Sequence, residues 1–137
     1  MKAANNNTAS GVAILHERSV LLAKRCNNCY LTNKPIPFGG YWSIFGGTID
    51  QGETPKECAG RELYEESKIF VDFKDIEFVK SFKDKYSTFY FHVHYCKEIV
   101  IPKLCKEHTE FGWFKIEQLK NFSEPIDPKI VDCITSL

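Results

Sequence analysis

Short runs rich in Val, Ile and Leu are separated along the chain by polar or Gly- and Pro-containing stretches. Residues 11–15 and 19–23 flank His16-Glu17-Arg18, which predicts two strands joined by a tight turn. Residues 75–82 and 88–96 alternate with a period of two, so we expect two long strands that pair through residues 83–87. Residues 111–116 predict one more strand.

One segment has the sequence of a helix start. Thr54 is a candidate N-cap with Glu57 three residues on, and Pro55 takes the first helical position, where its missing N–H costs nothing. We expect this helix to end near residue 68. Residues 117–122 predict a short helix and residues 127–137 a closing helix with Pro128 at its first position. The elements together predict a mixed α and β fold.

The segment before that helix is irregular. Residues 24–41 hold three Asn, two Pro and two Gly among their breakers of regular structure, which predicts a long loop. A short apolar segment at residues 42–45 follows and is stopped by Gly46-Gly47. The stretch 48–53 is polar and leads into the helix.

The composition fits one soluble domain. The chain has 137 residues, of which 43% are hydrophobic and 26% charged, so we expect residues 1–137 to form a single domain with residues 1–8 as a flexible N-terminus. A formal net charge of zero provides no field toward long nucleic acids or anionic membranes. No apolar run approaches the ~18 residues of a transmembrane helix, and the polar start lacks a secretory pattern. We therefore expect a cytoplasmic protein.

The six cysteines are scattered, which favours thiols over a disulfide framework. Cys26 and Cys29 have metal-ligand spacing, but no second pair completes a four-ligand zinc site.

Three carboxylates fall on one side of the predicted helix. Glu62, Glu65 and Glu66 are spaced three and four residues apart, which brings like charges together. One interpretation is a solvated helix face. The other depends on the preceding Gly46-Gly47, because carboxylates clustered around backbone carbonyls bind hard divalent cations.

The surrounding residues favour the second interpretation. Five residues separate Gly47 from Glu53, and seven more separate Glu53 from Arg61-Glu62-Leu63-Tyr64-Glu65-Glu66, with an aliphatic residue at Ile69. This pattern resembles the Nudix box, the signature of hydrolases that cleave nucleoside diphosphates linked to another group. One position departs from it, since Lys68 stands where the family has a glycine that ends the helix in a left-handed turn. We expect Lys68 to be strained there, or the helix to end differently.

The resemblance extends to Trp42 before the double glycine and to Glu107-His108 and Trp113-Phe114 near the end of the chain. It implies an α/β/α sandwich around a mixed β-sheet.

The resemblance also implies site roles. The metal ligands would be the Gly46 carbonyl and the carboxylates of Glu62, Glu65 and Glu66, with Glu107 or Glu110 adding one from a mobile loop. The ion is expected to be Mg²⁺, with Mn²⁺ as the alternative. Catalytic roles would fall to Glu62 as the general base, to Glu66 as the most important ligand, and to Glu53 and Arg61, which orient the cluster.

The substrate is less well defined by the sequence. The segment around Phe45 is similar to the branch of the family that hydrolyses oxidised purine nucleoside triphosphates, and Asp127 is a loose match to that branch's base-recognising acid. Ser43 stands where that branch has Asn, and its hydroxyl lacks the paired hydrogen bonds of an amide. Tyr86 instead matches a tyrosine of dinucleoside polyphosphate hydrolases. We expect Gly47, Phe45, Ser43, Tyr86 and Asp127 to contact substrate.

Two functional classes stay open. The first is a hydrolase that converts a nucleoside triphosphate to the monophosphate and pyrophosphate, or that cleaves another nucleotide derivative. The second is a non-catalytic nucleotide-binding module. Either would take a small-molecule nucleotide as partner, with a capped RNA end as the one nucleic-acid alternative, and would act as a monomer or homodimer.

Overall fold

The computed structural model describes residues 7–85 and 87–137. Its elements in chain order are β1 (Thr8–His16), β2 (Ser19–Arg25), β3 (Trp42–Ser43), β4 (Phe45–Thr48), α1 (Pro55–Ser67), η2 (Phe73–Asp75), β5 (Glu77–Lys83), β6 (Thr88–Tyr95), β7 (His108–Lys115), η3 (Ile116–Asn121) and α2 (Pro128–Thr135). The η elements are short 3₁₀-helices, of three residues in η2 and six in η3. No helix within the described ranges is long and apolar enough to cross a membrane.

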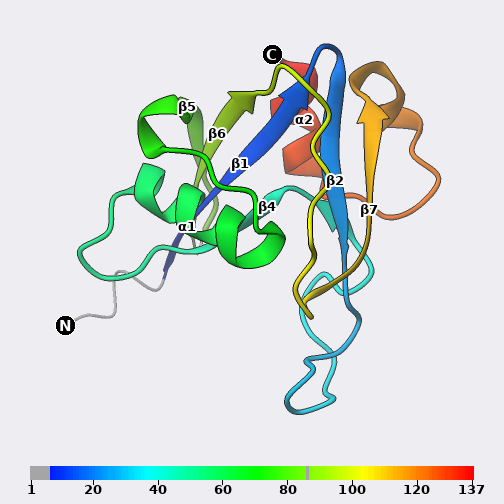
Figure 1. Ribbon diagram of the computed structural model, residues 1–137. Coiled ribbons are helices and arrows are strands. Elements are labelled where there is room, and N and C mark those ends of the chain that lie inside the picture. The colour runs from blue at the N-terminus through cyan, green and yellow to red at the C-terminus, as the bar shows by residue number, and fades with distance from the viewer. Residues whose placement is uncertain (1–6, 86) are drawn as a thin grey trace.

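The described strands form one mixed sheet in the order β3-β2-β1-β6-β5, with β4 added beside β1 and β7 beside β2 (Figure 1). β1 runs parallel to β6 and antiparallel to both β2 and β4. β4 borders the first half of β1, where Gly46 pairs with Gly11, and β2 borders the last two residues. The strand that leads into the predicted carboxylate cluster is therefore held directly against the centre of the sheet.

Helices cover both faces of this sheet. Val12 and Ile14 of β1 point to one face, where they pack with Ala59 and Leu63 of α1. The alternate residues, Ala13 and Leu15, pack on the other face with residues of η3 and α2, including Leu119, Ile130 and Ile134. This alternation follows from the two-residue period of a strand. The α/β/α sandwich and mixed sheet predicted from the sequence are confirmed.

The start of α1 is formed as predicted. The Thr54 hydroxyl accepts a hydrogen bond from the Glu57 amide at 3.1 Å, and the Glu57 carboxylate accepts one from the Thr54 amide at 2.9 Å. Pro55 occupies the first helical position. Each of these contacts lies within four residues, which is why the sequence alone was sufficient to predict them.

Lys68 ends α1 in a left-handed turn. This is the first of the two expected alternatives, in which a lysine adopts the conformation that the family's glycine has. Its φ is 62°, in the left-handed region, and its amide donates to the Tyr64 carbonyl at 2.9 Å. The turn that a glycine makes without strain is thus made here by a lysine, at a cost on the order of 1 kcal/mol.

Several boundaries differ from the prediction because long-range pairing extends the strands. β1 begins at Thr8, which pairs with Thr88 in β6, and β7 begins at His108, which pairs with Arg25. The expected flexible N-terminus, residues 1–8, overlaps β1 at Thr8, and residues 1–6 lie outside the described residues. The short helix predicted at residues 117–122 is present as the 3₁₀-helix η3, one residue earlier at each end.

Candidate active site

Glu66 is a buried carboxylate held against the double glycine. It is 4% exposed, and its Oε1 accepts a hydrogen bond from the Gly46 amide at 3.0 Å. Gly46 lies so close to β1 that a Cβ atom would be 2.5 Å from the Ser10 carbonyl oxygen. Only a residue without a side chain brings β4 near enough to β1 for its backbone to meet Glu66 in this way.

Glu62 lies over the next glycine. A Cβ atom on Gly47 would be 2.6 Å from the Glu62 carboxylate, so the carboxylate occupies the space that a side chain would need. Glu65 is 56% exposed, in contrast to the 15% exposure of Glu62. The three predicted carboxylates therefore share one side of α1, but they differ strongly in burial.

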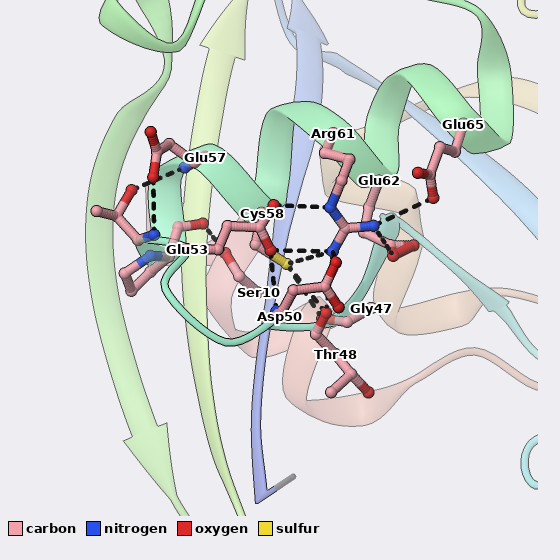
Figure 2. A network of polar contacts seen from close by, with 12 residues as sticks. Ser10, Gly47, Thr48, Asp50, Glu53, Glu57, Cys58, Arg61, Glu62 and Glu65 are labelled. Carbon is pink, nitrogen blue, oxygen red and sulfur yellow. Dashed lines mark hydrogen bonds and ion pairs between the residues drawn. The ribbon is translucent and has the colours of Figure 1, made fainter. Parts of the chain in front are cut away.

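Arg61 connects these carboxylates to the loop before the helix, as Figure 2 shows. Its Nε and Nη2 donate to the two oxygens of Glu53 at 2.7 and 3.0 Å, a bidentate arrangement. Its Nη1 donates to Glu62 and Glu65, at 3.1 Å each. Nη2 also donates to the Thr48 carbonyl at 3.1 Å. Arg61 thus joins Glu53 to Glu62 and Glu65, and the orienting role that the resemblance implies for Glu53 and Arg61 stays a prediction.

The pKa shifts follow from burial and from these contacts. The Arg61 guanidinium holds the pKa of Glu53 below its usual range, and Glu53 in turn raises the pKa of Arg61. Burial raises the pKa of Glu62, and the neighbouring Glu65 and Glu107 charges add to it. Burial and the Glu62 charge raise the pKa of Glu66 to about 9. Without a cation nearby, burial therefore favours the protonated, uncharged form of Glu66 at neutral pH, and a bound cation would favour its carboxylate form.

This donor set fits a divalent cation by its chemistry. Glu62 and Glu66 offer hard oxygen ligands beside a backbone that contributes carbonyl groups, as Mg²⁺ and Mn²⁺ prefer. The side chains are not closed around an ion, since among residues 7–85 and 87–137 no group of three or more His, Cys, Asp or Glu stands in ligating arrangement. Arg61 instead occupies oxygens of Glu62 and Glu65.

A cavity of about 440 Å³ opens beside this cluster, large enough for a small-molecule ligand. Gly46, Gly47 and Glu66 contribute to its lining on the α1 side, and the first residues of α2 contribute on the other. Of the predicted substrate contacts, Gly47, Ser43 and Asp127 line it. Tyr86 lies outside the described residues.

Phe45 does not line this cavity, contrary to our expectation. It is 1% exposed and packs in the core beneath α1, where its ring meets the edge of His108 at 5.3 Å between centroids. Because the β4 side chain at this position points toward α1, Phe45 packs beneath the site and is not among the residues that line the cavity.

The late segment contributes Glu107 and His108 rather than Glu110. The charge of Glu107 contributes to the raised pKa of both Glu62 and Glu66, whereas Glu110 forms an ion pair with Lys24 at 3.5 Å. His108 lines the cavity, and burial lowers its pKa to about 4. His108 is therefore a neutral hydrogen-bonding group at physiological pH.

Some residues at this site had not been recognised from the sequence. Asp50 forms an ion pair with Arg61 at 3.4 Å, and the Cys58 thiol, its pKa raised by burial to about 12, donates to the carbonyls of Gly47 and Thr48 at 3.5 Å. Asp84 and Lys129 line the far side of the cavity. Asp50, Asp84 and Lys129 have no distinctive spacing, because they reach the site from a loop, a turn or another helix. Cys58 lies on α1 itself, three residues before Arg61.

The comparisons with known proteins agree with this geometry. A segment of 59 residues, 42% of the chain, is 34% identical to an 8-oxo-dGTP diphosphatase of Proteus vulgaris and spans about half of that relative, 53% of its length. A MutT protein of Methanosarcina mazei Go1 superimposes with a TM-score of 0.67 at 24% identity, over 94% of this chain and 89% of that one.

The fold is also shared with a domain that was solved with a bound nucleotide derivative. The NUDIX domain of Shewanella oneidensis NrtR, solved in complex with ADP ribose, has a TM-score of 0.74 at 18% identity over 98% of this chain and 86% of that one. The family model described as NUDIX domain matches residues 5–133. With the Glu53, Arg61, Glu62 and Glu66 cluster in place, this match over nearly the whole sequence shows that the chain belongs to the Nudix hydrolase family.

Proposed function

We propose that this protein is a Mg²⁺-dependent hydrolase that converts a nucleoside triphosphate, with oxidised purines preferred, to the monophosphate and pyrophosphate. The observation that carries the proposal is the buried Glu66 carboxylate, 4% exposed, beside Glu62 at a cavity of nucleotide size. Carboxylates are costly to bury without a cation, so their retention here favours a site that binds one.

The chain's own residues have distinct roles in this reaction. Glu62, Glu65 and Glu66 with the Gly46 carbonyl would hold the ion, and Glu107 would add a carboxylate. Such an ion would neutralise charge on the diphosphate and lower the pKa of a water molecule, which would make its deprotonated, nucleophilic form available at neutral pH. Glu62 accepts the proton of the attacking water, and Arg61 holds Glu62 in position through the 3.1 Å contact. The Gly46 amide restrains Glu66.

The cavity walls support a nucleotide substrate. Phe82 and Phe89 stack at 5.4 Å between centroids, and Phe38 and Tyr41 form an edge-to-face pair at 5.5 Å. All four line the cavity and offer aromatic surface to a base. The name of the Proteus relative supports an oxidised purine. Asp127 lines the same cavity, although its Oδ1 already accepts the Lys129 amide at 3.0 Å.

The test is formation of a nucleoside monophosphate, with pyrophosphate measured beside it, in the presence of Mg²⁺ or Mn²⁺, from 8-oxo-dGTP, the ordinary nucleoside triphosphates, dinucleoside polyphosphates, ADP-ribose and capped RNA. The Glu66→Gln variant is expected to lose roughly 100-fold or more in kcat. Glu98→Gln, which neutralises an exposed carboxylate elsewhere, serves as the matched control and should keep full activity.

The outcomes separate the two functional classes. Turnover of a triphosphate that Glu66→Gln abolishes supports the proposal. Turnover of dinucleoside polyphosphates alone moves the protein to that substrate class. If no compound is hydrolysed although a nucleotide raises the melting temperature, the protein is a binding module and the proposal fails.

A further inference from the structure

The short strand β3 holds two segments of the chain, one on each side. On one side it pairs with β2. On the other it meets residues 125–127, the segment that leads into α2. Here the Trp42 amide donates to the Pro125 carbonyl at 2.9 Å, and the Asp127 amide donates to the Trp42 carbonyl at 3.1 Å. Because Ser43 and Asp127 both line the cavity, the backbone of Trp42 fixes how far the α2 wall lies from β3.

A single carboxylate oxygen ties the same segment to β3 and β2 through side chains. Glu124 Oε1 accepts the Trp42 indole N–H at 3.2 Å and lies 3.0 Å from Lys24 Nζ. Lys24 lies directly opposite Trp42 in the antiparallel pairing, so both side chains point to the same face of the sheet. Lys24 also pairs with Glu110 of β7 at 3.5 Å. The contacts of Glu124 therefore join the approach to α2 to three strands in a row.

The residue pair next to this row lines the cavity. Ala23 and Ser43 are paired on β2 and β3, and both contribute to the lining. Neighbouring residues of a strand point to opposite faces, and Trp42 accordingly packs in the core on the α2 side. Its contact with Glu124 is therefore made away from the cavity. These two side chains can affect a ligand only through the positions of Ser43 and Asp127.

The indole N–H gives Glu124 a role that an ion pair alone would not have. The Glu124 side chain is 44% exposed, and exposed ion pairs stabilise proteins little. Trp42, in contrast, is 4% exposed, and a buried indole needs a hydrogen-bond partner. Edge-to-face contacts with Phe114 and Phe122, at 5.3 and 5.8 Å between centroids, fix the direction of its ring. The N–H therefore points to one place, where it holds Glu124 and the chain that carries it.

We propose that Trp42 and Glu124 are positioning residues for the substrate. By holding residues 125–127 against β3, they set the separation of Ser43 and Asp127 across the cavity. This role rests on the proposed function, because it takes the cavity as the nucleotide site. The contacts that carry it involve β2, β3 and the approach to α2, whereas the carboxylate cluster lies on α1. Loosening them should therefore weaken nucleotide binding and leave the chemical step unchanged.

The test compares Glu124→Ala with Glu124→Gln, whose amide oxygen still accepts the indole N–H. Each protein is titrated with dGMP and 8-oxo-dGMP in the presence of Mg²⁺, which requires no turnover, and KM and kcat are measured for 8-oxo-dGTP. We expect Glu124→Ala to raise Kd and KM about 5- to 20-fold with kcat within about twofold of the wild type. Glu124→Gln should restore both to within about threefold, because the exposed ion pair contributes little.

Trp42→Phe shows whether the two side chains act as one contact. Phenylalanine keeps an aromatic ring in the core and removes the N–H, so it should weaken nucleotide binding as Glu124→Ala does. The double variant should then be no weaker than either single variant, because the same hydrogen bond is lost in all three. Glu117→Ala is the matched control. Glu117 is an exposed carboxylate of η3, 4.0 Å from Arg18 and outside the cavity lining, and its loss should leave the affinities unchanged.

NMR gives a signature that does not depend on activity. The chain has two tryptophans and therefore two indole N–H signals. Glu124→Ala should move the signal of Trp42 and leave that of Trp113, whose indole N–H donates to the Val100 carbonyl at 2.9 Å. The Asp127 amide, bonded to the Trp42 carbonyl, should exchange its hydrogen at least about tenfold faster in this variant.

Several results would overturn the positioning role. Affinities of Glu124→Ala equal to those of the wild type would do so, as would a loss carried by kcat instead of KM. Additive losses in the double variant would show that Trp42 and Glu124 act separately. Absence of nucleotide binding in the wild type would end the proposal as well. Binding that depends on Glu124 in a protein that hydrolyses none of the compounds would leave the role standing and reject the proposed activity.

Discussion

The Glu62 carboxylate lies so close to Gly47 that a methyl group on this glycine would be 2.6 Å from it. Gly46 is also crowded, but by the backbone of β1, with the Ser10 carbonyl oxygen at 2.5 Å from the same hypothetical atom. A flexible side chain can move aside, whereas a paired strand cannot, so the two adjacent glycines are required for different reasons.

Alanine at each glycine should separate these effects. Gly47→Ala displaces Glu62, and we expect kcat to fall at least about tenfold while the free energy of unfolding changes by less than about 1 kcal/mol. Gly46→Ala forces β4 from β1 and should cost about 1–3 kcal/mol. Urea unfolding and steady-state kinetics on both variants give the comparison. Equal destabilisation by the two would contradict it.

Removing Arg61 should destabilise the fold as well as the site. Arg61→Ala leaves Glu53, whose side chain is 13% exposed, without its bidentate partner, and we expect a loss of about 2 kcal/mol in urea unfolding. Arg61→Lys should recover little, because an ammonium cannot span both oxygens. Arg18→Ala is the control, since its 4.0 Å contact with Glu117 is exposed and should contribute under about 0.5 kcal/mol.

Replacing Lys68 by glycine should relieve the strained helix end. At φ 62° glycine is unstrained, so Lys68→Gly is expected to be about 1 kcal/mol more stable than Lys68→Ala, which keeps the strain. Both variants lose the contact of the ammonium with the Tyr64 ring at 5.1 Å, which cancels in the comparison. A glycine variant less stable than the alanine variant would show that the turn is relaxed.

Because of His92, the free energy of unfolding should decrease as the pH is lowered. It is 1% exposed and contacts the Gly11 carbonyl at 3.1 Å, and burial lowers its pKa from the ordinary value near 6.5. Between the two pKa values the unfolded chain binds the extra proton, so stability is complete above about pH 6.5 and decreases below it.

The measurement is the free energy of unfolding at several pH values for wild type and His92→Asn. The asparagine amide keeps a donor for Gly11 but does not titrate. Between pH 7 and pH 5 the free energy of unfolding should decrease less in His92→Asn than in the wild type. The difference between the two slopes should be at most about 1.4 kcal/mol per pH unit. Identical slopes would mean that His92 does not contribute.

The sequence was most informative where the relevant contacts are local or lie within one motif. Thr54 and Glu57 cap α1 through neighbours, and Glu53 meets Arg61 eight residues away across a single loop and helix turn. The spacing alone was enough to place Glu62 and Glu66 on one side of the helix.

Contacts between distant elements were not predictable in the same way. The burial of Phe45 depends on which face of β4 meets α1, and a four-residue strand is too short to show a pattern. Asp84 and Lys129 are 45 residues apart and meet only because the β5–β6 turn lies beside the start of α2. Neither position carries a local signal.

The position of β1 has a consequence for how the protein is made. This strand pairs with β2, with β4 and, along eight registered residues from Thr8 to Leu15, with β6, so its hydrogen-bonding partners are spread over most of the chain. Ser10 meets His92 across 82 residues. On a translating ribosome the double glycine emerges long before β6, so we expect the backbone around Gly46 to reach its final pairing only after residues 88–95 have emerged, and a chain cut before Thr88 to leave β1 as an unprotected edge.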